Sequence, residues 1–290
     1  MDKDYCCYIH TDSCFFSCYH WLEDNGVTEQ QWNKLSKDQK IKVIQQISEE
    51  VANYINEKSF EETQKQHYNS QVDDFKIVFE IEKIALSGLF KEKARYATWT
   101  LLDGGKWKDS MSITGLEIIR SDSPEIVKPM VKNVLEMILK QQDENDIRSY
   151  IKQCKKQIRK CGPEEIAENK GLNKLDKYLL PNFKWIKGTP HQLKGLANFR
   201  YLVNKLDIEG KYEEPHSGNK AKIVYIKKNP YNIESLSFIE WPKEFNDIGI
   251  CVDYEKMVQN NLIKKVKALL ELINKEHLLT TDQSVMNLFE

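Results

Sequence analysis

The sequence predicts an α+β fold: an antiparallel sheet with packed helices, followed by a mainly helical region that holds a small sheet. Three observations predict this class. Short segments rich in β-branched and aromatic residues dominate up to about residue 120, apolar residues at helical spacing dominate after it, and short polar or Gly-rich turns join successive strands. Strands that follow one another through such short turns pair antiparallel.

The composition is that of a soluble globular protein. No apolar run approaches the roughly 20 residues needed to cross a bilayer, so we expect no membrane partner. The N-terminus lacks a signal-peptide pattern, and the seven cysteines are an odd number that fits no disulfide framework. We therefore expect a cytoplasmic location, in the host cytoplasm if the protein is viral. The net charge of -1 still allows a local basic face that binds nucleic acid.

The first 120 residues predict mainly strands. Residues 4–19 predict a hairpin, because two aromatic-rich apolar segments flank a polar turn at His10, Thr11 and Asp12. Residues 34–54 predict an amphipathic helix that packs on a sheet. Further strands are predicted at residues 75–84, 96–102 and 112–119.

A change in composition near Arg120 predicts a domain boundary, which divides the chain into residues 1–120, 121–279 and a tail, 280–290. Ser123 and Pro124 predict the start of a helix, with Ser as its cap. Later elements are predicted at residues 191–206 (helix), 222–226 (strand) and 254–274 (helix).

The hairpin turn carries the strongest chemical signal. A carboxylate at a hairpin tip is held rigidly and can bind a divalent metal. Residues 8–13 (YIHTDS) resemble the Tyr-Gly-Asp-Thr-Asp-Ser motif of family B DNA polymerases, whose second aspartate is a metal ligand. The resemblance makes Asp12 a catalytic metal ligand. His10 stands where the motif has its first aspartate, and its imidazole can also coordinate metal. The resemblance further implies that Thr11 and Ser13 contact DNA.

Three further segments resemble the palm of the same family. Residues 79–83 are similar to the strand that bears a palm glutamate, which assigns a catalytic role to Glu82. Residues 93–96 resemble the Lys-Lys-Arg-Tyr motif that contacts primer-template DNA. They carry this role to Lys93, Arg95 and Tyr96, with Ala94 as a departure. Residues 113–124 resemble the crossing from palm to thumb, and Arg120 is the expected DNA-binding residue there.

The C-terminal half resembles the thumb. Residues 188–198 are similar to the family's Pro-x-His-x-Arg-Gly segment, which implies that His191 and Lys194 reach primer-strand phosphates. The last residues resemble the tail with which phage replicative polymerases bind a sliding clamp. Its expected clamp-binding residues are Val285, Met286, Leu288 and Phe289.

Taken over the chain, the resemblance implies the second half of a palm (1–120), a thumb (121–279) and a tail with a candidate clamp-binding peptide. Because Met1 opens directly in a palm strand, we expect a split polymerase. Its N-terminal partner chain would carry the exonuclease, the fingers and the first palm aspartate. The two chains would share two Mg²⁺ ions, bind primer-template DNA and dNTP, and polymerise only together.

Two other interpretations remain open at this point. His10 and Ala94 also fit a non-catalytic subunit with a degenerate palm that binds DNA and tethers a clamp. An unrelated α+β scaffold is the third interpretation. A zinc site at Cys14, Cys18 and His20 is disfavoured, because these residues lack paired Cys-x-x-Cys spacing.

Overall fold

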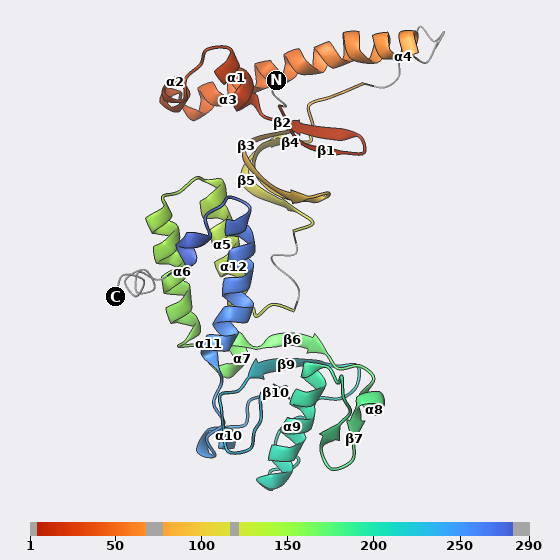
Figure 1. Ribbon diagram of the computed structural model, residues 1–290, viewed down its shortest axis with the longest axis vertical. Coiled ribbons are helices and arrows are strands. Elements are labelled where there is room, and N and C mark those ends of the chain that lie inside the picture. Colours follow the sequence, from red (N-terminus) through yellow and green to blue (C-terminus); the bar gives the residue numbers. More distant parts are fainter. Residues whose placement is uncertain (1–4, 68–77, 117–121, 281–290) are drawn as a thin grey trace. The chain divides into compact units, whose positions relative to one another are not determined.

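The computed structural model describes residues 5–67, 78–116 and 122–280. These residues form helices and antiparallel sheets joined by loops, which confirms the predicted α+β class. The chain forms two compact units, Met1–Leu116 and Glu117–Glu290, whose elements are labelled in Figure 1. No helix in the described ranges is both long enough and apolar enough to span a bilayer.

The first unit combines two antiparallel sheets with helices. Its strands are β1 (Cys6–His10), β2 (Ser13–Phe16), β3 (Lys83–Glu92), β4 (Arg95–Asp103) and β5 (Lys106–Thr114). Its helices are α1 (Cys18–Asp24), α2 (Glu29–Lys34), α3 (Lys37–Tyr54), the π-helical η1 (Ile55–Phe60) and α4 (Glu61–His67). Strands β1 and β2 form one sheet, and β3, β4 and β5 form the other in that order.

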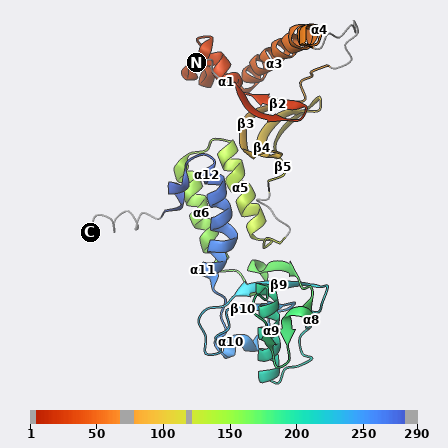
Figure 2. The ribbon, with the colours of Figure 1, turned by 45° about the vertical axis from the view of Figure 1, so that its right-hand side comes forward.

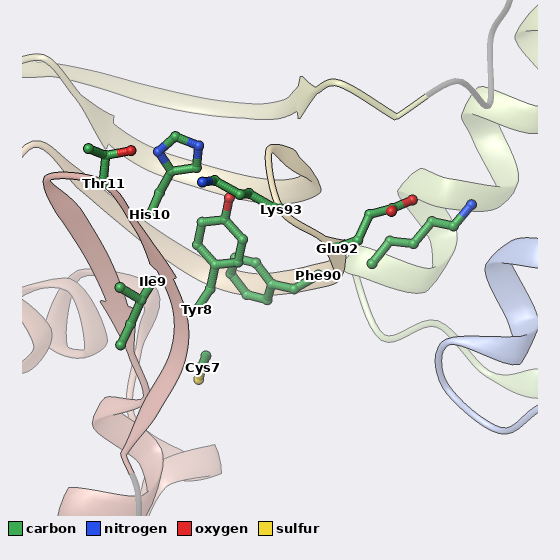
Figure 3. A pocket seen from close by; sticks show the side chains of 9 residues that line it. Cys7, Tyr8, Ile9, His10, Thr11, Phe90, Glu92 and Lys93 are labelled. Atoms are coloured by element: carbon green, nitrogen blue, oxygen red, sulfur yellow. The ribbon is translucent and has the colours of Figure 1, made fainter.

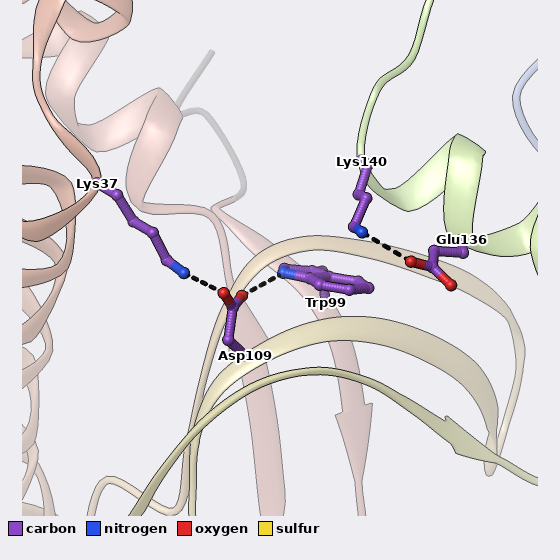
Figure 4. A network of polar contacts seen from close by, with 5 residues as sticks. All are labelled: Lys37, Trp99, Asp109, Glu136 and Lys140. Carbon is purple, nitrogen blue, oxygen red and sulfur yellow. Dashed lines mark hydrogen bonds and ion pairs between the residues drawn. The ribbon is translucent and has the colours of Figure 1, made fainter. Parts of the chain in front are cut away.

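The long helix α3 is capped and tied to the larger sheet. Ser36 and Gln39 form a capping box at its N-terminus, which satisfies two backbone donors there. Lys37, in its first turn, pairs with Asp109 of β5, whose carboxylate also accepts a 2.8 Å hydrogen bond from Trp99 Nε1 of β4 (Figure 4). These contacts fix the start of α3 against the sheet, and the predicted helix at residues 34–54 is confirmed.

Two strand predictions in this unit were wrong in position. Residues 78–82 are not a strand, and residues 75–77 lie outside the described ranges; β3 begins at Lys83. Strand β5 begins at Lys106 instead of residue 112, because Gly104 and Gly105 adopt positive φ and form a tight turn directly after β4. The first five residues of β5 are exposed, so they lack the alternation that marks a half-buried strand.

The second unit contains a helical layer and a helix-covered sheet. Its helices are α5 (Val127–Leu139), α6 (Glu144–Ile158), α7 (Pro163–Ile166), α8 (Leu175–Tyr178), α9 (His191–Lys205), α10 (Glu244–Asp247), α11 (Tyr254–Met257), η3 (Val258–Ile263), α12 (Lys264–Glu271) and η4 (Glu276–Leu279). Its strands are β6 (Glu168–Gly171), β7 (Leu179–Leu180), β8 (Lys184–Trp185), β9 (Lys220–Tyr225) and β10 (Ser235–Phe238). Helices α5, α6 and α12 pack together (Figure 2), and α9 covers the β10-β9-β6 sheet.

Most sequence predictions for this unit are confirmed. Helix α9 and strand β9 occupy the predicted ranges, and α11, η3 and α12 form the predicted last helix. The helix start at Ser123 and Pro124 was wrong, because α5 begins at Val127. Ser123 is buried, and its hydroxyl accepts a hydrogen bond from the ammonium of Lys265 instead of capping the helix.

Candidate active site at the hairpin tip

The β1–β2 hairpin presents Asp12 to solvent. His10 and Ser13 are cross-strand partners, so Thr11 and Asp12 alone form the connection. Both loop residues are exposed, whereas His10 and Ser13 are half-buried. Within the described ranges, the Asp12 carboxylate makes no hydrogen bond or ion pair. The Asp12 carboxylate therefore projects into solvent from the tip of a short hydrogen-bonded hairpin.

Four aromatic rings lock this hairpin onto the larger sheet. Tyr8 is the cross-strand partner of Phe15, and Phe90 is the partner of Tyr96. The two pairs pack on one another: Tyr8 stacks on Phe90 with ring centroids 5.4 Å apart, and Phe15 meets Tyr96 edge to face with ring centroids 5.4 Å apart. Each such aromatic contact contributes about 0.5–1.5 kcal/mol beyond its buried area.

The turn between β3 and β4 is tied to the hairpin. The Tyr8 hydroxyl oxygen accepts a 2.6 Å hydrogen bond from the backbone N–H of Ala94, which has φ of 57°. Gly115, after β5, has φ of +58°, and a Cβ there would overlap the carbonyl oxygen of Ala94. Sequence reasoning gave neither Tyr8 nor Gly115 a role, although both lie inside the motifs that it singled out.

An open hollow of about 590 Å³ lies between the hairpin and this turn (Figure 3). His10 and Thr11 line it from the hairpin, and Lys93 lines it from the turn. Its other lining residues are Cys7, Tyr8, Ile9, Phe90, Lys91 and Glu92. The hollow thus has an aromatic floor with polar and basic groups along its edge, next to the Asp12 tip.

The structure brings some predicted site residues together and separates others. His10, Thr11 and Lys93 share the hollow, and Tyr96 packs in the aromatic cluster beneath the hairpin. Arg95 makes a 2.8 Å ion pair with Glu92.

Glu82 lies away from the hollow. Glu82 directly precedes the first residue of β3, at the end of this ten-residue strand that is opposite the Ala94 turn. Its backbone carbonyl oxygen accepts a 2.9 Å hydrogen bond from Gly104 N–H. Arg120 lies outside the described residues, as do the tail residues Val285, Met286, Leu288 and Phe289.

The hairpin tip fits Mg²⁺ only in part. Carboxylate oxygens are preferred Mg²⁺ ligands, and Asp12 offers one carboxylate, whereas the imidazole of His10 suits softer metals better. In the part of the chain that the structure describes, no three His, Cys, Asp or Glu side chains gather closely enough to hold a metal ion. Asp12 can therefore supply one ligand but does not form a complete Mg²⁺ site with its neighbours.

In the second unit, His191 opens helix α9 and packs against the sheet. Its ring centroid lies 4.5 Å from that of Tyr225, and its Nε2 is buried without a hydrogen-bond partner among the described residues. Burial lowers the pKa of His191, so the imidazole is neutral at neutral pH. Lys194, one turn later, is half-buried and forms no ion pair within the described ranges. Gly195 beside it lets α9 approach β10 closely.

Comparison with known proteins identifies the family. The model of DNA polymerase family B matches residues 36–273, which include α3, the β3-β4-β5 sheet and most of the second unit. The chain belongs to DNA polymerase family B. The matched range begins after the hairpin, so the role of Asp12 depends on the residue 8–13 motif and its geometry.

A phage polymerase is similar over much of this family B chain. The DNA-directed DNA polymerase of Enterobacteria phage T4 is 26% identical over 196 residues. The aligned region covers 64% of this chain but only 21% of the T4 polymerase. The chain thus corresponds to about a fifth of that relative's length.

Proposed function

We propose that this chain is the C-terminal subunit of a split, template-directed DNA polymerase of family B. Residues 1–120 would be the second half of the palm, and residues 121–279 the thumb. The observation that carries the proposal is the exposed Asp12 carboxylate on a hairpin that Tyr8 ties to the segment of residues 93–96. Both segments resemble polymerase motifs, and they meet in a chain that the family model matches.

The chain's own residues would position substrates. The aromatic cluster holds the hairpin rigid, so Asp12 keeps a fixed position relative to the basic turn. Lys93 and Arg95 would bind phosphates of the primer-template, with Arg95 exchanging its exposed ion pair to Glu92 for DNA. Thr11, Ser13 and Tyr96 would line the same path. Such phosphate contacts set register on DNA without reading sequence.

Bound Mg²⁺ ions would activate the primer 3′-hydroxyl and hold the dNTP triphosphate. Asp12 would be one of their ligands, with His10 beside it. The first palm aspartate would come from an N-terminal partner chain, which would also carry the fingers and the exonuclease. Glu82 keeps its proposed catalytic role only if the partner's strands bring the end of β3 to the site.

The second unit would grip duplex DNA. Lys194 has no ion pair among the described residues and can meet a phosphate, and Arg120 would do so at the crossing between the units. His191, neutral at pH 7, would donate a hydrogen bond or support the N-terminus of α9. The tail, with Val285, Met286, Leu288 and Phe289, would bind a sliding clamp.

Primer extension with Mg²⁺ tests the proposal, using this chain alone, the N-terminal polymerase chain of the same genome alone, and both. We expect extension only in the mixture, reduced to background by Asp12→Ala. The matched control is Asp176→Ala, which removes an exposed aspartate from the second unit. Extension that survives Asp12→Ala would sink the assignment of Asp12. Stable association and DNA binding without extension would establish the non-catalytic DNA-binding subunit instead.

A further inference from the structure

A second hollow, about 210 Å³ in volume, opens between α1 and α3 of the first unit. Trp21 of α1 forms one wall. The α3 residues that line it are Ile47, Glu50, Val51 and Tyr54. Their spacing of i, i+3, i+4 and i+7 is that of the four residues that surround one inserted side chain in knobs-into-holes helix packing. The hollow therefore has the form of a hole for a side chain from another helix.

The hole is built on a fixed support. Ile47 is 4% exposed and forms its floor, whereas Tyr54 is 62% exposed and forms its rim. Ser48 of α3, which follows Ile47, lies near the Cys18 thiol of α1. Ser48 also donates a 2.8 Å hydrogen bond to the Ile44 carbonyl oxygen. A preformed hole costs little conformational entropy to fill.

Apolar exposure points to a protein partner for this unit. Most of the large hydrophobic side chains that are exposed in the described ranges belong to the first unit. They are Ile9, Tyr19, Tyr54, Val78, Leu86, Trp107 and Ile113. Of these, Tyr54 lies at the rim of the hole, so apolar surface is exposed at the hole itself.

Charge narrows the partner's chemistry. Glu50 stands in the wall of the hole, where its carboxylate accepts a 3.2 Å hydrogen bond from Gln46, and Lys58 Nζ lies 6.0 Å from the ring centroid of Tyr54 at the rim. The Glu50 carboxylate is the one charged group that lines the hole among the described residues, and it favours a helix that carries a basic residue beside an apolar one.

We propose that this hole receives an apolar side chain from a helix of the N-terminal polymerase chain, with an adjacent Lys or Arg paired to Glu50. The existence of that chain is part of the proposed function. The docking site is the added claim, and it concerns assembly, not chemistry. An interface of this kind would hold the two chains together whether or not DNA or Mg²⁺ is present.

Association of the two full chains, measured by isothermal titration calorimetry without DNA or Mg²⁺, tests the docking site. Tyr54→Glu should weaken binding at least about 10-fold, because aromatic residues dominate interface energetics and the change puts a charge at the rim of an apolar hole. Asn53→Glu is the matched control. It makes the same charge change one residue away, on a different face of α3, and should bind like the unchanged chain. Equal affinity of the Tyr54→Glu and Asn53→Glu variants would overturn the docking site.

A photo-crosslinking amino acid at position 54 provides a second readout. We expect a crosslink to a helix of the N-terminal chain that carries a basic residue near the crosslinked position. A crosslink to a second copy of this chain, or to DNA, would overturn the inference. If the two chains associate and extend primers while Tyr54→Glu binds normally, only the docking site fails. If they do not associate at all, the split-polymerase proposal fails with it.

Discussion

Replacing Gly195 by Ala should destabilise the second unit, although the same change in an open helix would stabilise it. Gly195 lies in α9, directly over β10. A Cβ at this position would stand 2.5 Å from Ser237 Oγ, 2.9 Å from Ser237 N and 3.0 Å from the Leu236 carbonyl carbon. Two of these neighbours are backbone atoms, so no side-chain rotation relieves them. The helix must move away from the sheet.

The expected magnitude follows from two opposing effects. Overpacking a tight site costs about 1–3 kcal/mol. Helix propensity favours Ala over Gly by about 0.8–1.0 kcal/mol. The net loss is about 1 kcal/mol, or a decrease in melting temperature of about 2–4 °C for a unit of this size.

Differential scanning calorimetry of the full chain measures this shift. Ser237→Ala in the Gly195→Ala background should recover only part of the loss, because it removes the hydroxyl oxygen but leaves both backbone contacts. Ser237→Ala alone corrects for the lost 2.7 Å hydrogen bond from Ser237 Oγ to the Gln192 carbonyl oxygen. A melting temperature that rises in Gly195→Ala would show that propensity decides the outcome, and would refute the close approach of α9 to β10.

Two further perturbations test contacts in each unit. Tyr8→Phe keeps the aromatic ring but removes the acceptor for Ala94 N–H. The change should lower the free energy of unfolding by about 1 kcal/mol and speed hydrogen exchange of the Ala94 amide. Unchanged exchange would contradict the role of Tyr8. Hydrogen bonds from Lys211, the Glu244 backbone and Tyr212 lower the pKa of Glu244 from 4.5 to about 2. This stabilisation is complete above pH 4.5 and disappears as the pH falls through about 2. Glu244→Gln should therefore have a lower urea midpoint than the unchanged chain at pH 7, and the gap should close between pH 4.5 and 2; a gap that is constant with pH would contradict this.

Local patterns in the sequence identified much of the fold and the core of the candidate site. The α+β class, the β1–β2 hairpin, α3 and α9 each follow from the spacing of apolar residues, because that spacing reports which face of an element is buried. The starts of strand β5 and helix α5 were misplaced because burial there does not follow the local sequence pattern. The first residues of β5 are all exposed, and the apparent cap residue Ser123 is buried in a contact with Lys265.

Sequence motifs also led to Asp12, His10 and Lys93, but their relation to one another required tertiary structure. The hydrogen bond that joins the hairpin to the basic turn links residues 86 positions apart, Tyr8 and Ala94. No local pattern encodes such a contact, because it depends on how two sheets pack. The hole on α3 illustrates the same limit. The sequence determined which residues share one side of that helix, whereas the packing of Trp21 beside them decided that they enclose a cavity, since a cavity exists only where separate elements leave space between them.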